Sequence, residues 1–442
     1  MRLRRGALPT AALAVAVASA AGTSALAAPG DAELASVNAK GEPLNRDSGL
    51  TAISADGRYT TFTIRLGLQP GDTVPEADGW MYDARRGRGE RISGSARNTD
   101  GHYDSAVSGD GRFTAFVSDS TDLVKQRTDG GALSDHRHDV FVYDRERGKT
   151  TWVSRDAGKG GRAALSPAIS DDGRFVAFAS SSTNYDVPQD LGSGKDYRIF
   201  VYDRKRKKTE LASVSDENEV PDQSAWEPSI SGGGRHVTYY SKATNLAGGQ
   251  DERKYDVFRF DLRTEETTLV SVPLAGPGAR GGSYQPDISA DGNLVAFSSL
   301  ASDLVPADPN GSQQDIFVRD IAAGTTRLVT LPEPADPAGA DNYSDFPSIS
   351  ADGRYVAFHS AASNLAAGDT NGELDVFRTD LLDGTTELVS MSIEAPGRSA
   401  NADSTDAALS ADGQTIAFVS KANDVGPEDG RRTDVFVRKL GP

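Results

Sequence analysis

Two acidic segments of the chain have residue types and spacing that suit calcium. Each begins Asp-x-Asn-Gly and is followed within a few residues by another Asp, so the candidate ligands are Asp308, Asn310, Asp315, Asp369, Asn371 and Asp375. Calcium binds carboxylate and amide oxygens, and the glycine at the fourth position resembles part of a calcium loop. The Glu that usually ends such a loop is missing, and Asp and Asn also cap turns without a metal. Turn capping is therefore the alternative interpretation of both segments.

Two histidines, His136 and His138, stand two residues apart and would share one face of a strand, which is a workable spacing for a metal. A solvated loop is the alternative interpretation and the one we favour. The chain has no Gly-x-Ser-x-Gly elbow, no glycine-rich phosphate loop and no His-Glu-x-x-His pair. We therefore expect a binding or protein-interaction module rather than an enzyme. The alternative is a metal-assisted polysaccharide lyase or glycosidase, with the two histidines as first candidates.

These residues are positioned by a repeat of roughly sixty residues that occurs seven times. Its anchor is a tetrapeptide that begins with serine and ends, in six copies, in Asp-Gly. The seven copies are Ser54–Gly57, Ser108–Gly111, Ser170–Gly173, Ser231–Gly234, Ser289–Gly292, Ser350–Gly353 and Ser410–Gly413. Asp-Gly between two apolar runs is a strong hairpin signal because both residues tolerate positive φ. The sequence therefore predicts a hairpin at the same place in every copy.

The residues after each anchor predict a buried strand. Eight positions after the serine stands an aromatic in every copy: Phe62, Phe116, Phe178, Tyr239, Phe297, Phe358 and Phe418. A β-branched residue lies two positions earlier, with Ala or Thr between, so large side chains fill one face and small ones the other. Two further strands follow, as at Asp139–Asp144, and one precedes the anchor. Seven copies of four antiparallel strands predict an all-β, seven-bladed β-propeller.

The seventh copy is incomplete, which predicts how the ring closes. It ends at its third strand, Asp434–Lys439, whereas Glu33–Val37 repeats Glu210–Val214, the fourth strand of copy three, residue for residue. We expect residues 33 to 37 to pair with the last blade and to cover its exposed edge. Residues 28–442 would then form a single propeller domain.

Residues 1–27 have the features of a signal peptide. Arg2, Arg4 and Arg5 precede an alanine-rich apolar stretch, and Ala25-Leu26-Ala27 is a small-x-small cleavage site. We expect export by the Sec or the twin-arginine route to the cell envelope or exterior, and no stable membrane insertion after cleavage. Because the chain has no cysteine, it forms no disulfide.

The charge balance narrows the classes of partner. The formal net charge is −17 at pH 7. An acidic protein repels a phosphate backbone, so nucleic acid is not an expected partner, and cations or basic groups are favoured. The remaining partner classes are a protein or a carbohydrate, bound by what we expect to be a monomer.

The motif Ser-x-Asp-Gly-Arg-x-Val-Ala-Phe is clearest at Ser170–Phe178 and Ser350–Phe358. It resembles the repeat of TolB-type propellers, a WD-like family of bacterial envelope and secreted proteins, and the resemblance covers essentially the whole mature chain. It implies the propeller fold but little about activity, because translocation proteins, peptidase accessory domains and lyases share it. TolB itself has six blades and an extra N-terminal domain, so the seven repeats here do not imply a Tol-Pal role.

Antiparallel strands would place the long connections of every blade on one face of the disc and the short turns on the other. Binding residues on a rigid scaffold concentrate in variable loops, so we expect the ligand on the face with the long connections. This face would carry the residues that stand five positions before the anchor serine, among them Tyr103, Trp226 and Tyr284. Close to that position it would also carry Asp104, Glu227 and Tyr343. Aromatic and acidic side chains together suit a neutral sugar or a basic peptide. The alternative is that the rings cover the core between blades.

Overall fold

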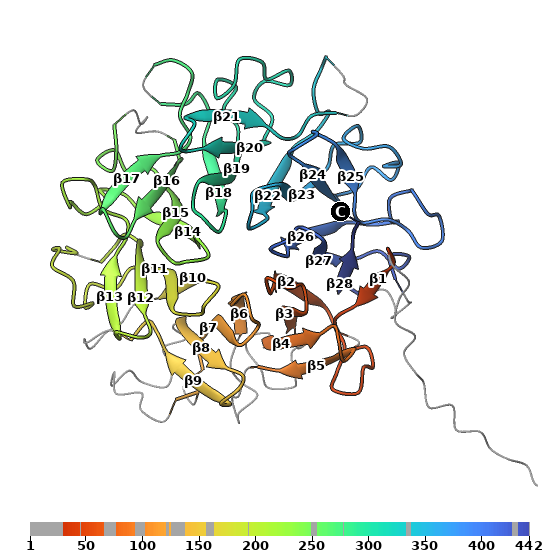
Figure 1. Cartoon of the computed structure of the whole chain (residues 1–442), viewed down its shortest axis with the longest axis horizontal. Helices are drawn as coiled ribbons and strands as arrows, with labels where there is room; N and C mark the ends of the chain where they lie inside the picture. Colours follow the sequence, from red (N-terminus) through yellow and green to blue (C-terminus); the bar gives the residue numbers. More distant parts are fainter. Residues whose placement is uncertain are drawn as a thin grey trace, which may run out of the picture.

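Each copy of the repeat folds into one four-stranded antiparallel sheet, and seven such sheets surround a common axis in the computed structural model (Figure 1). The predicted seven-bladed propeller is therefore confirmed. The structure describes residues 30–441 apart from 45, 66–76, 93–101, 121–122, 125–137, 156–162, 193, 249–253, 277, 333–336 and 427–431. The expected signal peptide and His136 lie outside the described residues. Within the described part, no helix is long and apolar enough to cross a bilayer.

The strands of a blade follow one another from the axis outward. The inner strands are β2 (Ser48–Ile53), β6 (His102–Val107), β10 (Ala164–Ile169), β14 (Ala225–Ile230), β18 (Ser283–Ile288), β22 (Ser344–Ile349) and β26 (Ser404–Leu409). The second strands are β3 (Tyr59–Arg65), β7 (Phe113–Ser118), β11 (Phe175–Ser180), β15 (His236–Ser241), β19 (Leu294–Ser299), β23 (Tyr355–Ser360) and β27 (Thr415–Ser420). The third strands are β4 (Ala77–Asp83), β8 (Asp139–Asp144), β12 (Arg198–Asp203), β16 (Asp256–Asp261), β20 (Asp315–Asp320), β24 (Asp375–Asp380) and β28 (Asp434–Lys439). The outer strands are β5 (Arg88–Arg91), β9 (Lys149–Trp152), β13 (Lys208–Leu211), β17 (Glu266–Leu269), β21 (Thr325–Leu328), β25 (Thr386–Leu388) and, in blade seven, β1 (Ala32–Leu34).

The aromatic row predicted for the second strands forms the core of the blades. All seven rings are fully buried. Each lies opposite an aromatic of the third strand, as Phe178 lies opposite Phe200 with ring centroids 6.0 Å apart. The small residues beside them, such as Ala177, are equally buried because neighbouring blades pack on that face. The alternation of large and small side chains thus produces sheets buried on both sides.

The ring closes through β1, which pairs antiparallel with β28 so that Glu33 lies opposite Val437. This pairing confirms the predicted closure by the N-terminal strand. The strand is shorter than expected, Ala32–Leu34 instead of residues 33 to 37, although the Ala35 N–H still donates to the Val435 carbonyl at 2.7 Å, as Ala212 does to Ile199 beyond the outer strand of blade three.

The anchor turns of neighbouring blades touch one another around the axis. Backbone hydrogen bonds of 2.9 to 3.0 Å run from Ala55 to Gly109, Gly109 to Asp171, Asp171 to Gly232, Ala290 to Ala351, Ala351 to Ala411 and Ala411 to Ala55. The last glycine of the anchor also packs under the preceding blade, since a Cβ on Gly111 would stand 2.0 Å from the Tyr59 ring. These hydrogen bonds join the anchor turns of neighbouring blades on the short-turn face.

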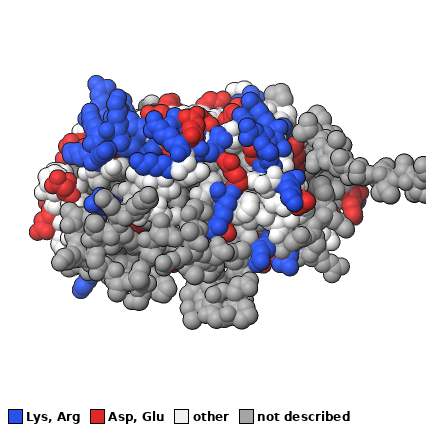
Figure 2. All heavy atoms as spheres, turned by 90° about the horizontal axis from the view of Figure 1, so that it is seen from below, with Lys and Arg blue, Asp and Glu red and all other residues white. Residues whose placement is uncertain are grey.

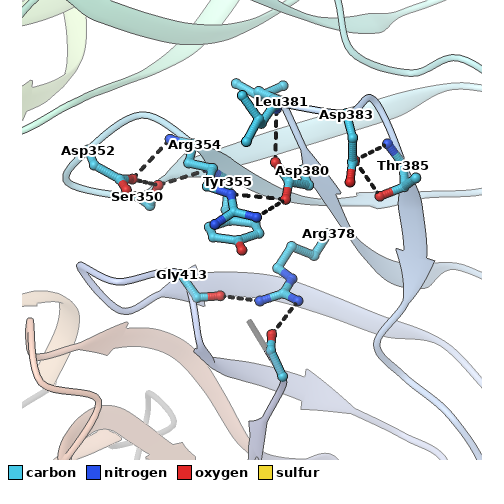
Figure 3. A network of polar contacts seen from close by, with 12 residues as sticks. Ser350, Asp352, Arg354, Tyr355, Arg378, Asp380, Leu381, Asp383, Thr385 and Gly413 are labelled. Atoms are coloured by element: carbon cyan, nitrogen blue, oxygen red, sulfur yellow. Dashed lines mark hydrogen bonds and ion pairs between the residues drawn. The ribbon is translucent and has the colours of Figure 1, made fainter.

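The short-turn face also carries a repeated ion pair, drawn for blade six in Figure 3. Arg354 donates through Nε at 3.0 Å and Nη2 at 2.6 Å to the Asp380 carboxylate at the end of β24. Its guanidinium covers the Tyr355 ring at 4.7 Å, and that of Arg378 lies 4.5 Å from the same ring. Equivalent pairs join Arg58 to Asp83, Arg112 to Asp144, Arg174 to Asp203 and Arg235 to Asp261. These pairs tie the second strand to the third at the end of the hairpin.

Candidate channel site and its surroundings

The inner strands break their hydrogen-bond ladder at one position and bulge there. In blade four the register shifts between Trp226 and Ser229, and Glu227 has a φ of 45°, in the left-handed region. The equivalent residues of blades three, five, six and seven have φ between 50° and 52°: Ser166, Gln285, Phe346 and Asp406. In blades three to six a proline follows, and proline, which lacks an N–H, is tolerated in a sheet at such bulges. Residues other than glycine rarely adopt this conformation, and such strain clusters at functional sites.

The bulged residues line a cavity of roughly 520 Å³ around the axis. Blade two contributes Asp104 of β6, which occupies the same repeat position as Glu227. The polar and aromatic side chains of the wall are Asp104, Ser166, Glu227, Ser229, Gln285, Asp287, Phe346, Ser348 and Asp406, and prolines, alanines, isoleucines and a leucine complete it. This volume suits a small ligand or one extended segment of a partner.

Asp104 is repelled by two other carboxyl groups of the channel wall. Burial raises the pKa of Asp104 to about 7, and the charges of Glu227 and Asp406 add to that rise. Burial also raises the pKa of Glu227 and the pKa of Asp406. A cation between such groups would relieve both their repulsion and their desolvation, so the channel favours positively charged ligands.

Asp287, a further acid of the wall, has a structural role. Its carboxylate accepts hydrogen bonds from the Ser229 hydroxyl of blade four at 2.7 Å and from the Ile349 N–H of blade six at 2.8 Å. Burial raises its pKa, while these donors oppose the rise. Because its oxygens already have donors on two neighbouring blades, Asp287 holds the inner strands together and is a poor candidate for contact with a ligand.

The structure separates the predicted aromatic residues from the predicted acids. Asp104 and Glu227 come together in the channel, whereas Trp226 packs on Tyr197 with ring centroids 4.5 Å apart and is not part of the cavity wall. Tyr343 is 38% exposed. The side chain of Tyr103 lies outside the described residues.

Tyr284 belongs to an aromatic cluster between blades four and five. Its ring centroid is 5.7 Å from that of Tyr240 and 5.3 Å from that of Tyr255. The Tyr240 hydroxyl is hydrogen-bonded to the Glu227 carboxylate, so the cluster adjoins the channel acids. The Lys242 ammonium already lies 4.5 Å from the centre of the Tyr255 ring, which shows that the cluster can hold a cation.

Sequence reasoning missed Ser166, Gln285, Phe346 and Asp406, although it had found two members of the same ring. Their common signal is the place four residues before the anchor serine, followed in four copies by proline. The preceding position carries the more conspicuous aromatic residues, such as Trp226 and Tyr284. A proline at one fixed place in an otherwise regular strand indicates a bulge, and a bulge redirects the neighbouring side chain.

The candidate metal ligands lie away from the channel. Asp308 and Asn310 precede β20, and Asp369 and Asn371 precede β24, while Asp315 and Asp375 are the first residues of those strands. His138 precedes β8 and is partly buried. Among the residues that the structure describes, no group of three or more His, Cys, Asp or Glu side chains is arranged to hold a metal. Any site in the two loops would therefore need amide or backbone oxygens as well.

Charge is unevenly distributed despite the acidic total. Figure 2 shows Lys and Arg side chains gathered on one face of the disc. The turns between third and outer strands of blades one to three supply such residues: Arg85, Arg86, Arg88, Arg145, Arg147, Lys149, Arg204, Lys205, Arg206, Lys207 and Lys208. These turns belong to the short-turn face, so that face carries a basic outer rim around blades one to three. The net charge alone gave no sign of this separation.

Comparisons with known proteins bear on the fold. No protein-family model and no curated protein matches the chain. The β-propeller domain of the Trilobed protease from Pyrococcus furiosus is similar in structure, with a TM-score of 0.52, 9% sequence identity, and coverage of 89% of this chain and 95% of that one. Oligogalacturonate lyase from Vibrio parahaemolyticus has a TM-score of 0.52, 9% identity, and coverage of 94% of this chain and 99% of that one.

TolB proteins are also among the similar structures. TolB from Acinetobacter baumannii has a TM-score of 0.43 and 14% identity, and the match covers 75% of this chain and 63% of that one. This chain thus spans less than two thirds of that TolB. The chain is a seven-bladed β-propeller, and protease and lyase propellers share its fold.

Proposed function

We propose that the protein is an exported binding module whose channel takes a positively charged segment of a peptide or protein partner. The observation that supports this most is the meeting of Asp104, Glu227 and Asp406 at one ring of bulged positions. Their side chains come from blades two, four and seven, so only the closed propeller brings them together. We place the ligand on the face with the long connections because variable loops on a rigid scaffold commonly carry binding residues.

The charge of the site selects the ligand class. Three carboxyl groups in a partly buried channel repel anionic polymers and attract lysine, arginine or amine groups. A cation bound there would lower the raised pKa of Asp104, so binding would be accompanied by proton release near neutral pH. The proposed partner is therefore a basic peptide segment.

Aromatic side chains at the rim would hold the rest of the ligand. Trp226 and Tyr284 are partly exposed, and the Tyr240 contact joins the Tyr284 cluster to Glu227. Aromatic rings offer a large contact area at little entropic cost, and they accept both cations and the apolar faces of sugars. We propose Tyr103 and Tyr343 as further members of this rim.

The proposal is tested by probing the mature protein with an array of basic, neutral and acidic peptides and neutral glycans. Preferential binding of basic peptides, weakened by Glu227→Gln and by Asp406→Asn, supports the proposal. Binding of neutral glycans that is unaffected by these changes would move the site to the aromatic rim. Metal-dependent cleavage of oligogalacturonate would instead favour the lyase alternative, and His136 and His138 would then be the first residues to replace.

A further inference from the structure

The two acidic loops contain buried oxygen atoms that turn capping does not account for. In the blade-five loop the Asp308 carboxylate uses Oδ1 to accept the Gly311 N–H at 3.1 Å, as a capping residue does. Its Oδ2 is buried and accepts no hydrogen bond within the described part of the chain. The same is true of Asn310 Oδ1. The capping interpretation therefore explains one oxygen of this pair of residues and leaves two unexplained.

Asp315 adds a third such atom to the loop. Its side chain is fully buried, and Oδ1 accepts the Thr330 hydroxyl at 2.6 Å and the Asn310 carboxamide at 3.3 Å. Its Oδ2 has no donor among the described residues. The contact with Asn310 shows that the amide and the carboxylate face each other. Three oxygens from an eight-residue segment are thus buried together without donors.

Blade six repeats the arrangement of the two aspartates, while Asn371 Oδ1 there accepts the Glu373 N–H at 2.9 Å and has one lone pair left for a metal. Asp375 is fully buried and accepts the Ser390 hydroxyl at 2.5 Å through Oδ1, while Oδ2 has no donor among the described residues. Asp369 is 9% exposed and its Oδ1 is likewise without a donor there. The carboxyl groups of Asp369 and Asp375 lie within hydrogen-bonding distance of each other, and the Asn371 side chain contacts the Asp375 carboxylate. Buried carboxylate oxygens without donors thus occur at equivalent places in two successive blades, which a single packing defect would not produce.

Leaving such oxygens without a partner is costly. A buried polar atom without a hydrogen bond costs about 1 to 3 kcal/mol, and a charged one costs more. A cation removes this cost for all the oxygens at once and also cancels the repulsion between the paired carboxylates. The structure thus assigns a calcium ion to each of two loops, held by Asp308, Asn310 and Asp315 in blade five and by Asp369, Asn371 and Asp375 in blade six.

The donor set selects calcium among the common metals. The candidate ligands are all oxygens, and neither group includes His or Cys, which zinc and copper prefer. Calcium accepts six to eight oxygens in flexible geometry, so backbone carbonyls and water can complete the shell. Magnesium demands near-ideal octahedral geometry and keeps several waters, which suits a buried, irregular loop less well.

Calcium would have a structural consequence at both sites, because each loop contacts the segment that leads into the next blade. The Asn310 carboxamide donates to the Ala340 carbonyl at 3.1 Å, and that of Asn371 donates to the Ala400 carbonyl at 2.7 Å. The ions would fix the junctions of blades five with six and six with seven on the long-connection face. This role is independent of the proposed binding of a basic ligand in the channel.

The experiment measures calcium stoichiometry and thermal unfolding of the mature protein after treatment with a chelator. We expect two calcium ions per chain, and at free calcium about 100-fold above Kd each site should raise the ratio of folded to unfolded protein about 100-fold. Asp315→Asn should abolish one ion and Asp375→Asn the other. If Asp315→Asn or Asp375→Asn fails to fold, Asp308→Ala and Asp369→Ala replace them, because these two residues lie in the loops and not in the strands. Each of these variants should also lose one calcium ion.

Asp256→Asn in β16 is the matched control. Asp256 accepts the Ser271 hydroxyl at 2.7 Å as Asp315 accepts Thr330, but no Asp-x-Asn-Gly loop precedes it, so this variant should keep both ions. Magnesium at the same concentration should have a much smaller effect than calcium. Identical melting curves in calcium and in chelator, with no ion bound, would overturn the proposal. Unchanged stoichiometry in the Asp315 and Asp375 variants would overturn it as well.

Discussion

The Ser36 hydroxyl donates a hydrogen bond of 2.5 Å to the Asp434 carboxylate, although the two residues are 398 positions apart. The same contact joins the fourth strand to the third in other blades, as Ser154 joins Asp139 at 2.8 Å. Blade seven is therefore completed by a residue from the other end of the described chain, with the geometry of an uninterrupted blade. The N-terminal segment acts as the missing fourth strand of the ring.

Removing this segment should destabilise the whole propeller. Deleting residues 28 to 38 exposes the edge of β28, and we expect the free energy of unfolding to fall by several kcal/mol out of a usual margin of about 5 to 15. Ser36→Ala alone should cost about 1 to 3 kcal/mol because it leaves a buried carboxylate without its donor. Lys40→Ala, in the exposed turn beyond, is the control and should have little effect. An unchanged melting temperature after the deletion would contradict closure by β1.

The buried rings of the second strands should be equivalent. Replacing Phe116, Phe178, Phe297, Phe358 or Phe418 by Ala should each lower the free energy of unfolding by about 3 to 5 kcal/mol. Leu382→Ala is the control, because this side chain is 80% exposed. Denaturant titration of the set measures the effect. If any of the five Phe variants lost less unfolding free energy than Leu382→Ala, that ring would not belong to the buried core.

The anchor glycines should be needed for space as well as for their conformation. Gly111 and Gly148 have φ of +68° and +58°, but a Cβ would meet the Tyr59 ring only at Gly111. Gly148→Ala should cost about 1 to 2 kcal/mol through the left-handed backbone alone. Gly111→Ala should cost more, and the difference in unfolding free energy isolates the packing between blades. Equal losses of unfolding free energy in the two variants would contradict close packing of Gly111 against the neighbouring blade.

The ion pairs on the short-turn face should protect the fold against acid. The hydrogen bond from Arg174, opposed by burial, holds the pKa of Asp203 at about 2, below its value in the unfolded chain. A carboxyl group whose pKa is lower in the folded state stabilises the fold above its unfolded pKa, and this contribution is lost as the pH falls towards 2. Asp203→Asn should therefore be less stable than the wild type at pH 7 and lose less stability between pH 4 and pH 2. Parallel stability profiles of the two proteins would contradict this role of the pair.

Much of the fold follows from local sequence pattern, and the channel follows from it only in part. The buried position of Phe178 and the closure by Glu33 were predictable because period-two alternation and internal repetition are visible in the sequence itself. Asp406 was missed because a left-handed bulge, and not the strand period, decides which side chain lines the channel. The neighbouring Thr405 offered no aromatic signal.

The loops show a similar limit. Their Asp-x-Asn-Gly pattern indicated candidate calcium ligands, but the sequence could not distinguish them from turn caps. The distinction depends on which oxygens find donors once the Ala340 and Ala400 segments pack against the loops. The basic rim on blades one to three was hidden for another reason, because a net charge averages over both faces of the disc.

The affinity of the mature protein for a short oligolysine peptide, measured by isothermal titration calorimetry, tests the proposed function most directly. We expect Asp104→Asn combined with Glu227→Gln to weaken binding at least about tenfold, and added salt to weaken binding to the wild type. Glu146→Gln, at an exposed acid on the short-turn face, should leave the affinity unchanged. Equal affinities of the wild type and the channel variant, or loss of affinity only in Glu146→Gln, would contradict a cation-binding channel.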